Sequence, residues 1–118
     1  MRHRGLRVTI RHALEAPIEK RVAADALEKL GVVSLKLTLR YDAGWPDRFF
    51  LIPGGRPLFI EFKRPGDLPR ALQEQRHATL RKLGYQTEVC DDYEDAMRLI
   101  EQARENAINE ALRTRKRR

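Results

Sequence analysis

Cysteine and long apolar runs are almost absent from this sequence, and each absence excludes a class of protein. The only cysteine is Cys90, so neither an internal disulfide nor a cysteine-rich zinc site can form. No apolar run approaches the length of a membrane-spanning helix. The basic start of the chain is not followed by the apolar segment of a secretory signal. Together these absences predict a protein of the cytosol, that is, a cytoplasmic protein.

Basic residues outnumber acidic ones and give the chain a formal net charge of +7. An excess of this size favours polyanionic partners, either nucleic acid or an anionic membrane surface, although a solvated basic surface is the simpler alternative. The length of 118 residues predicts one domain, residues 1–118. We assign a basic N-terminal arm to about residues 1–14 and a basic, mobile C-terminal tail to about residues 113–118.

The spacing of apolar residues and the turn residues between them predict the order helix, three strands, helix, strand, helix. Helices are expected where apolar side chains recur every three or four residues, and strands where they alternate or cluster. The helices are expected at about 17–30, at about 70–83 and, after a capping run at 91–95, over about 96–112. The strands are expected at about 33–39, 49–52, 58–62 and 85–90. This αβββαβα order predicts an α/β fold with a mixed β-sheet flanked by helices, and a right-handed crossover between the last two strands.

The hairpin formed by the second and third strands carries charged side chains at its open end. Pro53-Gly54-Gly55 is strong turn chemistry between two apolar runs, yet Asp47, Glu61 and Lys63 flank these runs. Alternation along a strand puts Glu61 and Lys63 on one side, and Asp47 at the start of the neighbouring strand is within reach of Glu61. Two interpretations are open. Lys63 neutralises a carboxylate in an ion pair, or the carboxylates hold a divalent cation such as Mg²⁺ or Mn²⁺.

Pro46-Asp47, thirteen further residues and then Glu61-Phe62-Lys63 resemble the signature of PD-(D/E)xK nucleases. The segment Gly44-Trp45-Pro46-Asp47-Arg48, the Gly54-Gly55 turn and Gln75 resemble the VRR-NUC nucleases, particularly the short stand-alone phage and bacterial type. The resemblance covers about residues 18–100. It implies a restriction-endonuclease-like fold and a Mg²⁺- or Mn²⁺-dependent endonuclease that hydrolyses phosphodiester bonds in branched or structured DNA, in a bacterial or phage-infected cell. A homodimer that resolves four-way (Holliday) junctions is the specific form implied. A catalytically inactive basic DNA-binding module on the same fold is the alternative.

The resemblance also implies a set of metal ligands. Asp47 and Glu61 would bind the ion, with the backbone carbonyl of Phe62 as a further ligand. Glu19, on the first predicted helix, matches a glutamate that completes the metal shell directly or through water. Its nearest competitor is Glu15, which precedes the helix. From the pattern alone, a solvated glutamate beside Lys20 is the simpler interpretation of Glu19.

Two further residues have implied catalytic roles. Lys63 would position the attacking water and offset negative charge, and Gln75 would hold Lys63 or that water in place. Helical spacing predicts an inward face with Leu72, Thr79, Leu80 and Leu83, and it puts Gln75 on the same side as Leu72 and Thr79. His77 is expected on the outer face of the same helix.

Several basic side chains near the predicted site are candidates for contact with the DNA backbone. Arginine suits this role because its guanidinium group matches phosphate geometry. The simpler alternative for each is a side chain directed to water. The candidates are Lys36, Arg40, Arg48, Arg64 and Arg76.

Overall fold

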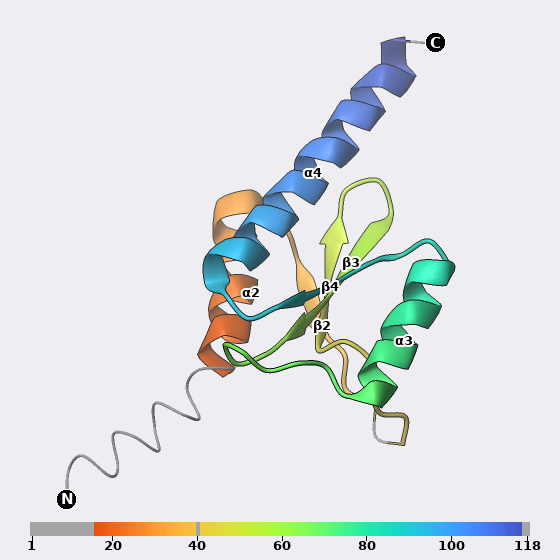
Figure 1. The fold of residues 1–118 in the computed structure, drawn as a ribbon. Helices are drawn as coiled ribbons and strands as arrows, with labels where there is room; N and C mark the ends of the chain where they lie inside the picture. The colour runs from red at the N-terminus through yellow and green to blue at the C-terminus, as the bar shows by residue number, and fades with distance from the viewer. Residues whose placement is uncertain (1–15, 40, 117–118) are drawn as a thin grey trace, which may run out of the picture.

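The observed elements follow the order that the sequence predicts (Figure 1). The computed structural model describes residues 16–39 and 41–116. Glu15, Arg40 and the predicted arm at residues 1–14 lie outside the described residues. The elements are, in chain order, α2 (Ala16–Leu30), β1 (Ser34–Lys36), β2 (Arg48–Ile52), β3 (Arg56–Phe62), α3 (Ala71–Lys82), β4 (Gln86–Cys90) and α4 (Tyr93–Lys116).

The four strands form one mixed sheet in the order β1-β2-β3-β4. The first three strands pair antiparallel with their neighbours, and β4 pairs parallel with β3. A parallel pair needs a crossover connection, and α3 supplies it between β3 and β4. The predicted fold class is confirmed: this is an α/β, restriction-endonuclease-like arrangement of a mixed sheet flanked by helices (Figure 1).

The turn between β2 and β3 fixes the register of the central strands. Gly54 and Gly55 have φ angles of +87° and +73°, which side chains rarely tolerate. The hairpin closes on the pair Ile52 and Arg56, and the register then runs through to the pair Arg48 and Ile60. Because a slip of one residue would turn every side chain to the other face, this turn decides which residues meet on each face.

One face of the sheet carries the apolar core. Leu58, Ile60 and Phe62 of β3 are buried on this face, where α4 packs on the sheet and α2 packs on α4. Cys90 is buried in this core, and burial raises the pKa of its thiol to about 12. The other buried apolar residues of this core are Val22, Ala26, Val32, Phe50, Ile52, Ala96, Ile100 and Ala107.

The opposite face is covered by α3 and is less completely apolar. The rings of Phe49 and Phe59 lie 5.6 Å apart, and the ring of Tyr85 meets Phe59 edge-on at 5.7 Å. The helix α3 buries only His77 and Leu80. Because α3 contributes few apolar side chains to this face, polar side chains can be buried at the end of β3.

Two details differ from the prediction. The strand β1 spans Ser34–Lys36 rather than 33–39, because it is an edge strand whose pairing with β2 ends at Lys36 and Arg48. The helix α4 continues to Lys116, so residues 113–116 of the predicted mobile tail are helical. Among the residues that the structure describes, no helix is both long and apolar enough to cross a bilayer.

Candidate active site

Asp47 and Glu61 meet at the open end of the β2–β3 hairpin. Continuing the register one residue beyond the pair Arg48 and Ile60 puts Asp47 opposite Glu61, on the same face of the sheet. The backbone amide of Phe62 donates a hydrogen bond of 2.8 Å to Asp47 Oδ2. The carboxylates predicted to converge therefore lie on one side of the sheet, as the sequence indicates.

Lys63 lies beside Glu61 at this position. Its Nζ lies 3.8 Å from Glu61 Oε2, and its side chain is only 12% exposed. Its backbone amide donates to the carbonyl of Cys90 at 2.8 Å, which ties this end of β3 to β4. The ion pair between Lys63 and Glu61 was one of the two open interpretations. This ion pair is present in the structure.

His77, which the sequence placed on the outer face of α3, is buried against this cluster. It is 1% exposed, and its Nε2 lies 3.8 Å from Glu61 Oε1. Burial lowers the pKa of His77 below its ordinary value of 6.5, and the positive charges of Arg81 and Lys63 lower it further. The imidazole is therefore neutral at pH 7, so its contact with Glu61 is not an ion pair.

The expected position of Gln75 is wrong. Gln75 is exposed, as are Leu72 and Thr79, whose spacing had suggested an inward face. The face of α3 that meets the sheet runs through His77 and Leu80, of which Leu80 was predicted to face inward and His77 was not. The polar side chain that α3 brings to Glu61 is therefore an imidazole and not the predicted amide.

Glu19 is held by two cations on the other side of the sheet. It is 7% exposed, and its Oε2 lies 3.6 Å from Lys36 Nζ and 3.8 Å from Arg48 Nη2. Lys36 and Arg48 are register partners that alternate with the residues facing α3, so they point away from the face of Glu61. The ion pairs of Glu19 therefore lie on the other face of the sheet from Asp47 and Glu61. Its role as a metal ligand stays a prediction.

The basic candidates for DNA contact occupy unequal positions. Arg48 is turned inward with a side chain 15% exposed, and it also donates to Ser34 Oγ at 3.1 Å. Lys36 is exposed beside Glu19, and Arg64 is exposed and paired with Asp67 at 3.3 Å. The exposed positions of Lys36 and Arg64 suit a contact with phosphate better than the position of Arg48 does.

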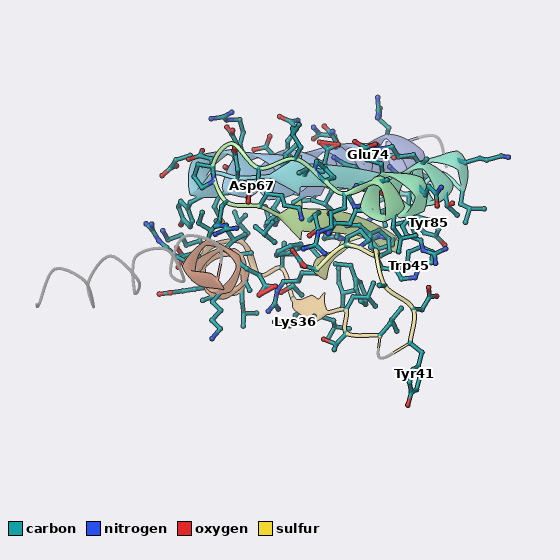
Figure 2. The ribbon with its side chains drawn as sticks, turned by 60° about the horizontal axis from the view of Figure 1, so that its bottom comes forward. Lys36, Tyr41, Trp45, Asp67, Glu74 and Tyr85 are labelled. Carbon is teal, nitrogen blue, oxygen red and sulfur yellow. The ribbon has the colours of Figure 1, made fainter. Side chains whose placement is uncertain are left out.

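Arg76 anchors the loop that leads into Asp47. Its Nη2 donates to Asp42 Oδ1 at 2.7 Å, and its guanidinium group lies 5.0 Å from the ring centre of Trp45. Gly44 adopts a φ of +91°, and a Cβ there would lie 2.7 Å from Leu72 Cγ, so the loop sits directly on α3. In Figure 2, Trp45 lies against the body of the molecule while Tyr41 projects from the loop.

Hard oxygen ligands are available at this end of the sheet for a divalent ion. Asp47 and Glu61 supply two carboxylates, and the backbone carbonyl of Phe62 lies between Glu61 and Lys63 in the chain. Within residues 16–39 and 41–116, no three histidine, cysteine, aspartate or glutamate side chains gather as a metal site would require. Two carboxylates with water and substrate phosphate are nevertheless a usual set for Mg²⁺, so the residues fit such an ion.

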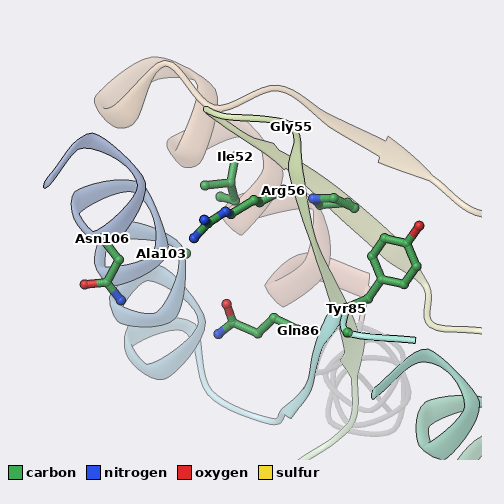
Figure 3. Close-up of a pocket in the computed structure, with 9 residues that line it drawn as sticks. Ile52, Gly55, Arg56, Tyr85, Gln86, Ala103 and Asn106 are labelled. Carbon is green, nitrogen blue, oxygen red and sulfur yellow. The ribbon is translucent and has the colours of Figure 1, made fainter. Parts of the chain in front are cut away.

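A cavity at the opposite end of β3 is less suited to this chemistry. It has a volume of about 480 Å³ and lies between the hairpin, the start of β4 and the middle of α4 (Figure 3). Arg56 extends from β3 toward this helix and pairs with Glu110. The described residues that line it include no carboxylate: Ile52, Gly55, Arg56, Pro57, Gly84, Tyr85, Gln86, Ala103 and Asn106.

Comparisons with known proteins place the chain in one family, although no protein-family model matches it. Over 77 residues the chain is 36% identical to "Putative nuclease p44" of Acyrthosiphon pisum secondary endosymbiont phage 1, a match that covers 65% of this chain and 82% of that protein. A solved structure described as "VRR_NUC domain" is 30% identical with a TM-score of 0.65, and the match covers 74% of this chain and 94% of that one. A second, described as "VRR_NUC domain protein", is 19% identical and shares the fold with a TM-score of 0.64 over 76% of this chain and 87% of its own. The chain belongs to the VRR-NUC family of nucleases.

Proposed function

We propose that this nuclease is a metal-dependent endonuclease that hydrolyses phosphodiester bonds in DNA at the cluster of Asp47, Glu61 and Lys63. One observation carries the proposal: the two carboxylates share one face at one strand end, with an ammonium group 3.8 Å from Glu61. A carboxylate as deeply buried as that of Glu61 is costly unless it has a cationic partner. A divalent ion would add to the partial neutralisation that Lys63 already provides.

Asp47, Glu61 and the carbonyl of Phe62 would hold Mg²⁺ or Mn²⁺, with Glu19 as a more distant candidate that needs rearrangement of its ion pairs with Lys36 and Arg48. Such an ion, when bound, polarises a scissile phosphate and lowers the pKa of a bound water.

Lys63 has the position to act on the substrate directly. Its ammonium group can donate hydrogen bonds to a phosphate oxygen or to the attacking water, and it offsets the negative charge that develops on the phosphate. The hydrogen bond from the Phe62 amide keeps Asp47 beside this group. Gln75, the predicted partner of Lys63 or the water, is exposed and would need to act through a contact made by bound DNA.

The basic surface supports DNA as the substrate. A formal net charge of +7 attracts the phosphate backbone, and Lys36 and Arg64 present exposed cationic groups. Binding of this kind weakens steeply as salt rises, because neutralised phosphates release counterions. Affinity measured between 50 and 200 mM salt therefore separates phosphate binding from a neutral contact.

The decisive experiment compares cleavage of linear, flapped, splayed and four-way DNA by the wild-type chain, Asp47→Asn and Glu61→Gln, with Mg²⁺ or Mn²⁺. The proposal expects cleavage by the wild type only when a metal ion is present, and loss of cleavage in both variants with DNA binding retained. Salt-sensitive binding without cleavage by the wild type would support the alternative, an inactive DNA-binding module. Wild-type rates in both variants would put the active site elsewhere.

We also propose that the enzyme works as a homodimer on four-way junctions, since paired cuts need two active sites. An apolar stripe on the last turns of α4 supports this, because Ile108 and Leu112 are 37% and 50% exposed there. The helix extends beyond the sheet in this region (Figure 1), where a second copy could cover the stripe. Sedimentation of the wild type and of Leu112→Asp tests the proposal. A dimer is expected only for the wild type, and a wild-type monomer at micromolar concentration would contradict it.

A further inference from the structure

His77 is the buried polar group that the sequence did not connect with the site. His77 comes from α3 and Glu61 from β3, and the two side chains come close because α3 crosses over the sheet between β3 and β4. Both side chains are almost fully buried, at 1% and 2% exposure. Buried polar atoms normally have hydrogen-bond partners. Among the described residues, His77 Nε2 has none.

The geometry brackets Glu61 between two nitrogen atoms. Lys63 Nζ lies 3.8 Å from Oε2, and His77 Nε2 lies 3.8 Å from Oε1, so each carboxylate oxygen has its own nitrogen neighbour. A separation of 3.8 Å is longer than a hydrogen bond, and a shift of about 1 Å in either side chain would close it. Contacts of catalytic groups are often long before substrate binds and shorten afterwards.

We propose that His77 is a positioning residue of the nuclease site, which donates a hydrogen bond from Nε2–H to Glu61 Oε1 and so fixes the orientation of this carboxylate. The inference rests on the proposed function, because the hydrogen bond from His77 would orient Glu61 toward a metal ion. With Oε1 held by a neutral donor, Oε2 is left for the ion and for Lys63. Partners of this kind, one step behind a ligand, typically change metal affinity or activity by about 10–100-fold.

The enclosure of His77 between α3 and the sheet suits this role, because it holds the ring in one orientation beside Glu61. An imidazole that carries its proton on Nε2 can donate to a carboxylate oxygen, which accepts.

The test uses two replacements at position 77 and two controls on α3. His77→Leu keeps apolar bulk but removes the donor, whereas His77→Gln keeps an amide donor. Leu80→Ala disturbs the same buried face without changing a polar group, and Thr79→Ala changes an exposed residue whose hydroxyl bonds only within the helix. Each protein is assayed for thermal stability, Mn²⁺ binding by calorimetry, and the Mn²⁺ concentration that gives half-maximal cleavage.

We expect His77→Leu to raise the Mn²⁺ dissociation constant and the half-maximal concentration by about 10–100-fold, and His77→Gln to restore most of the loss. Leu80→Ala should lower the melting temperature and leave the metal requirement unchanged, and Thr79→Ala should change neither. An unaltered metal requirement in folded His77→Leu would overturn the inference. So would an equal loss in Leu80→Ala, because the effect would then come from packing.

A measurement without metal separates this inference from the proposed function. The ¹⁵N shifts of the His77 ring at pH 7.5 report which nitrogen carries the proton. We expect the proton on Nε2, facing Glu61, and a change of these shifts in Glu61→Gln. A proton on Nδ1 alone would overturn the positioning role. If the wild type neither binds Mn²⁺ nor cuts DNA, the proposed function fails, and the ring shifts still decide whether His77 donates to Glu61.

Discussion

The two faces of β3 are made by one stretch of seven residues, yet they have opposite properties. Leu58, Ile60 and Phe62 point into an apolar core beneath α4, whereas Phe59 and Glu61 point toward α3. The first face is closed by hydrocarbon contacts, and the second ends in a group of charges and an imidazole. Stability and chemistry are therefore carried by alternate residues of the same strand, and each can be disturbed separately.

The largest expected effect comes from breaking the apolar face. Phe50→Ala removes a fully buried ring from β2, and we expect it to lower the free energy of unfolding by about 3–5 kcal/mol. The loss is measured by urea denaturation. At a temperature where the variant is folded, its Mn²⁺ requirement for cleavage should equal that of the wild type, and a changed requirement would show that the two faces are not separable.

The next effect is the reverse case, in which only the charged face is changed. Glu61→Gln preserves the shape of a buried side chain and removes its charge. Metal-ion catalysis contributes several kcal/mol, so we expect cleavage to fall by about 10²–10³-fold with little change in melting temperature. Single-turnover cleavage and thermal unfolding measure the two quantities. A large drop in stability together with activity would contradict the separation of the faces.

A smaller effect is expected where α3 meets the loop before Asp47. Arg76→Ala removes the contacts with Asp42 and Trp45, which are partly exposed, so the cost in stability should be about 1 kcal/mol. Because this loop leads to Asp47, cleavage should fall severalfold more than DNA binding does. Arg76→Lys keeps the charge but not the planar contact and is the matched control. Equal losses of binding and cleavage would favour direct DNA contact instead.

The smallest expected effect is a dependence of stability on pH that comes from His77, the imidazole on the charged face. Its pKa is lowered in the folded state by burial, so unfolding allows it to bind a proton more readily. The stability that its neutral form contributes is complete above pH 6.5 and is lost as the pH falls below 6.5 toward the lower pKa of the folded protein. Melting temperatures from pH 7.5 to pH 5 should decline less in His77→Leu than in the wild type. Parallel declines would show that other groups dominate.

The fold and the carboxylate pair could be predicted because their determinants are local. Strand alternation fixes which side Glu61 faces, and the glycine turn fixes how far Asp47 lies from it. The rotation of α3 was not predictable in the same way, because its leucines mark no single inward stripe. Leu72 and Leu83 are exposed by 41% and 68%, so only Leu80 identifies the true face and with it His77. This buried leucine, three residues after His77, was the available signal.

The environment of Glu19 illustrates a second limit of sequence reasoning. Its place on the first helix was predicted, but the solvated side chain that the pattern favoured is wrong, because Glu19 is 7% exposed. Which cations would reach it depends on how the helix lies across the sheet edge, and Lys36 and Arg48 come from two separate strands. Contacts between elements of this kind are set by tertiary packing, and no periodicity along the chain encodes them.

The hydrogen bond from the Phe62 amide to Asp47 has a consequence for how this enzyme comes into being. Its donor belongs to the main chain, so changes to the Phe62 side chain other than proline leave the donor in place, and alignment of the two strands brings that donor to the Asp47 carboxylate. A misaligned or partly formed hairpin would lack a working centre altogether. Nicking of DNA could accordingly serve as a sensitive report on whether newly made chains have reached their proper strand alignment.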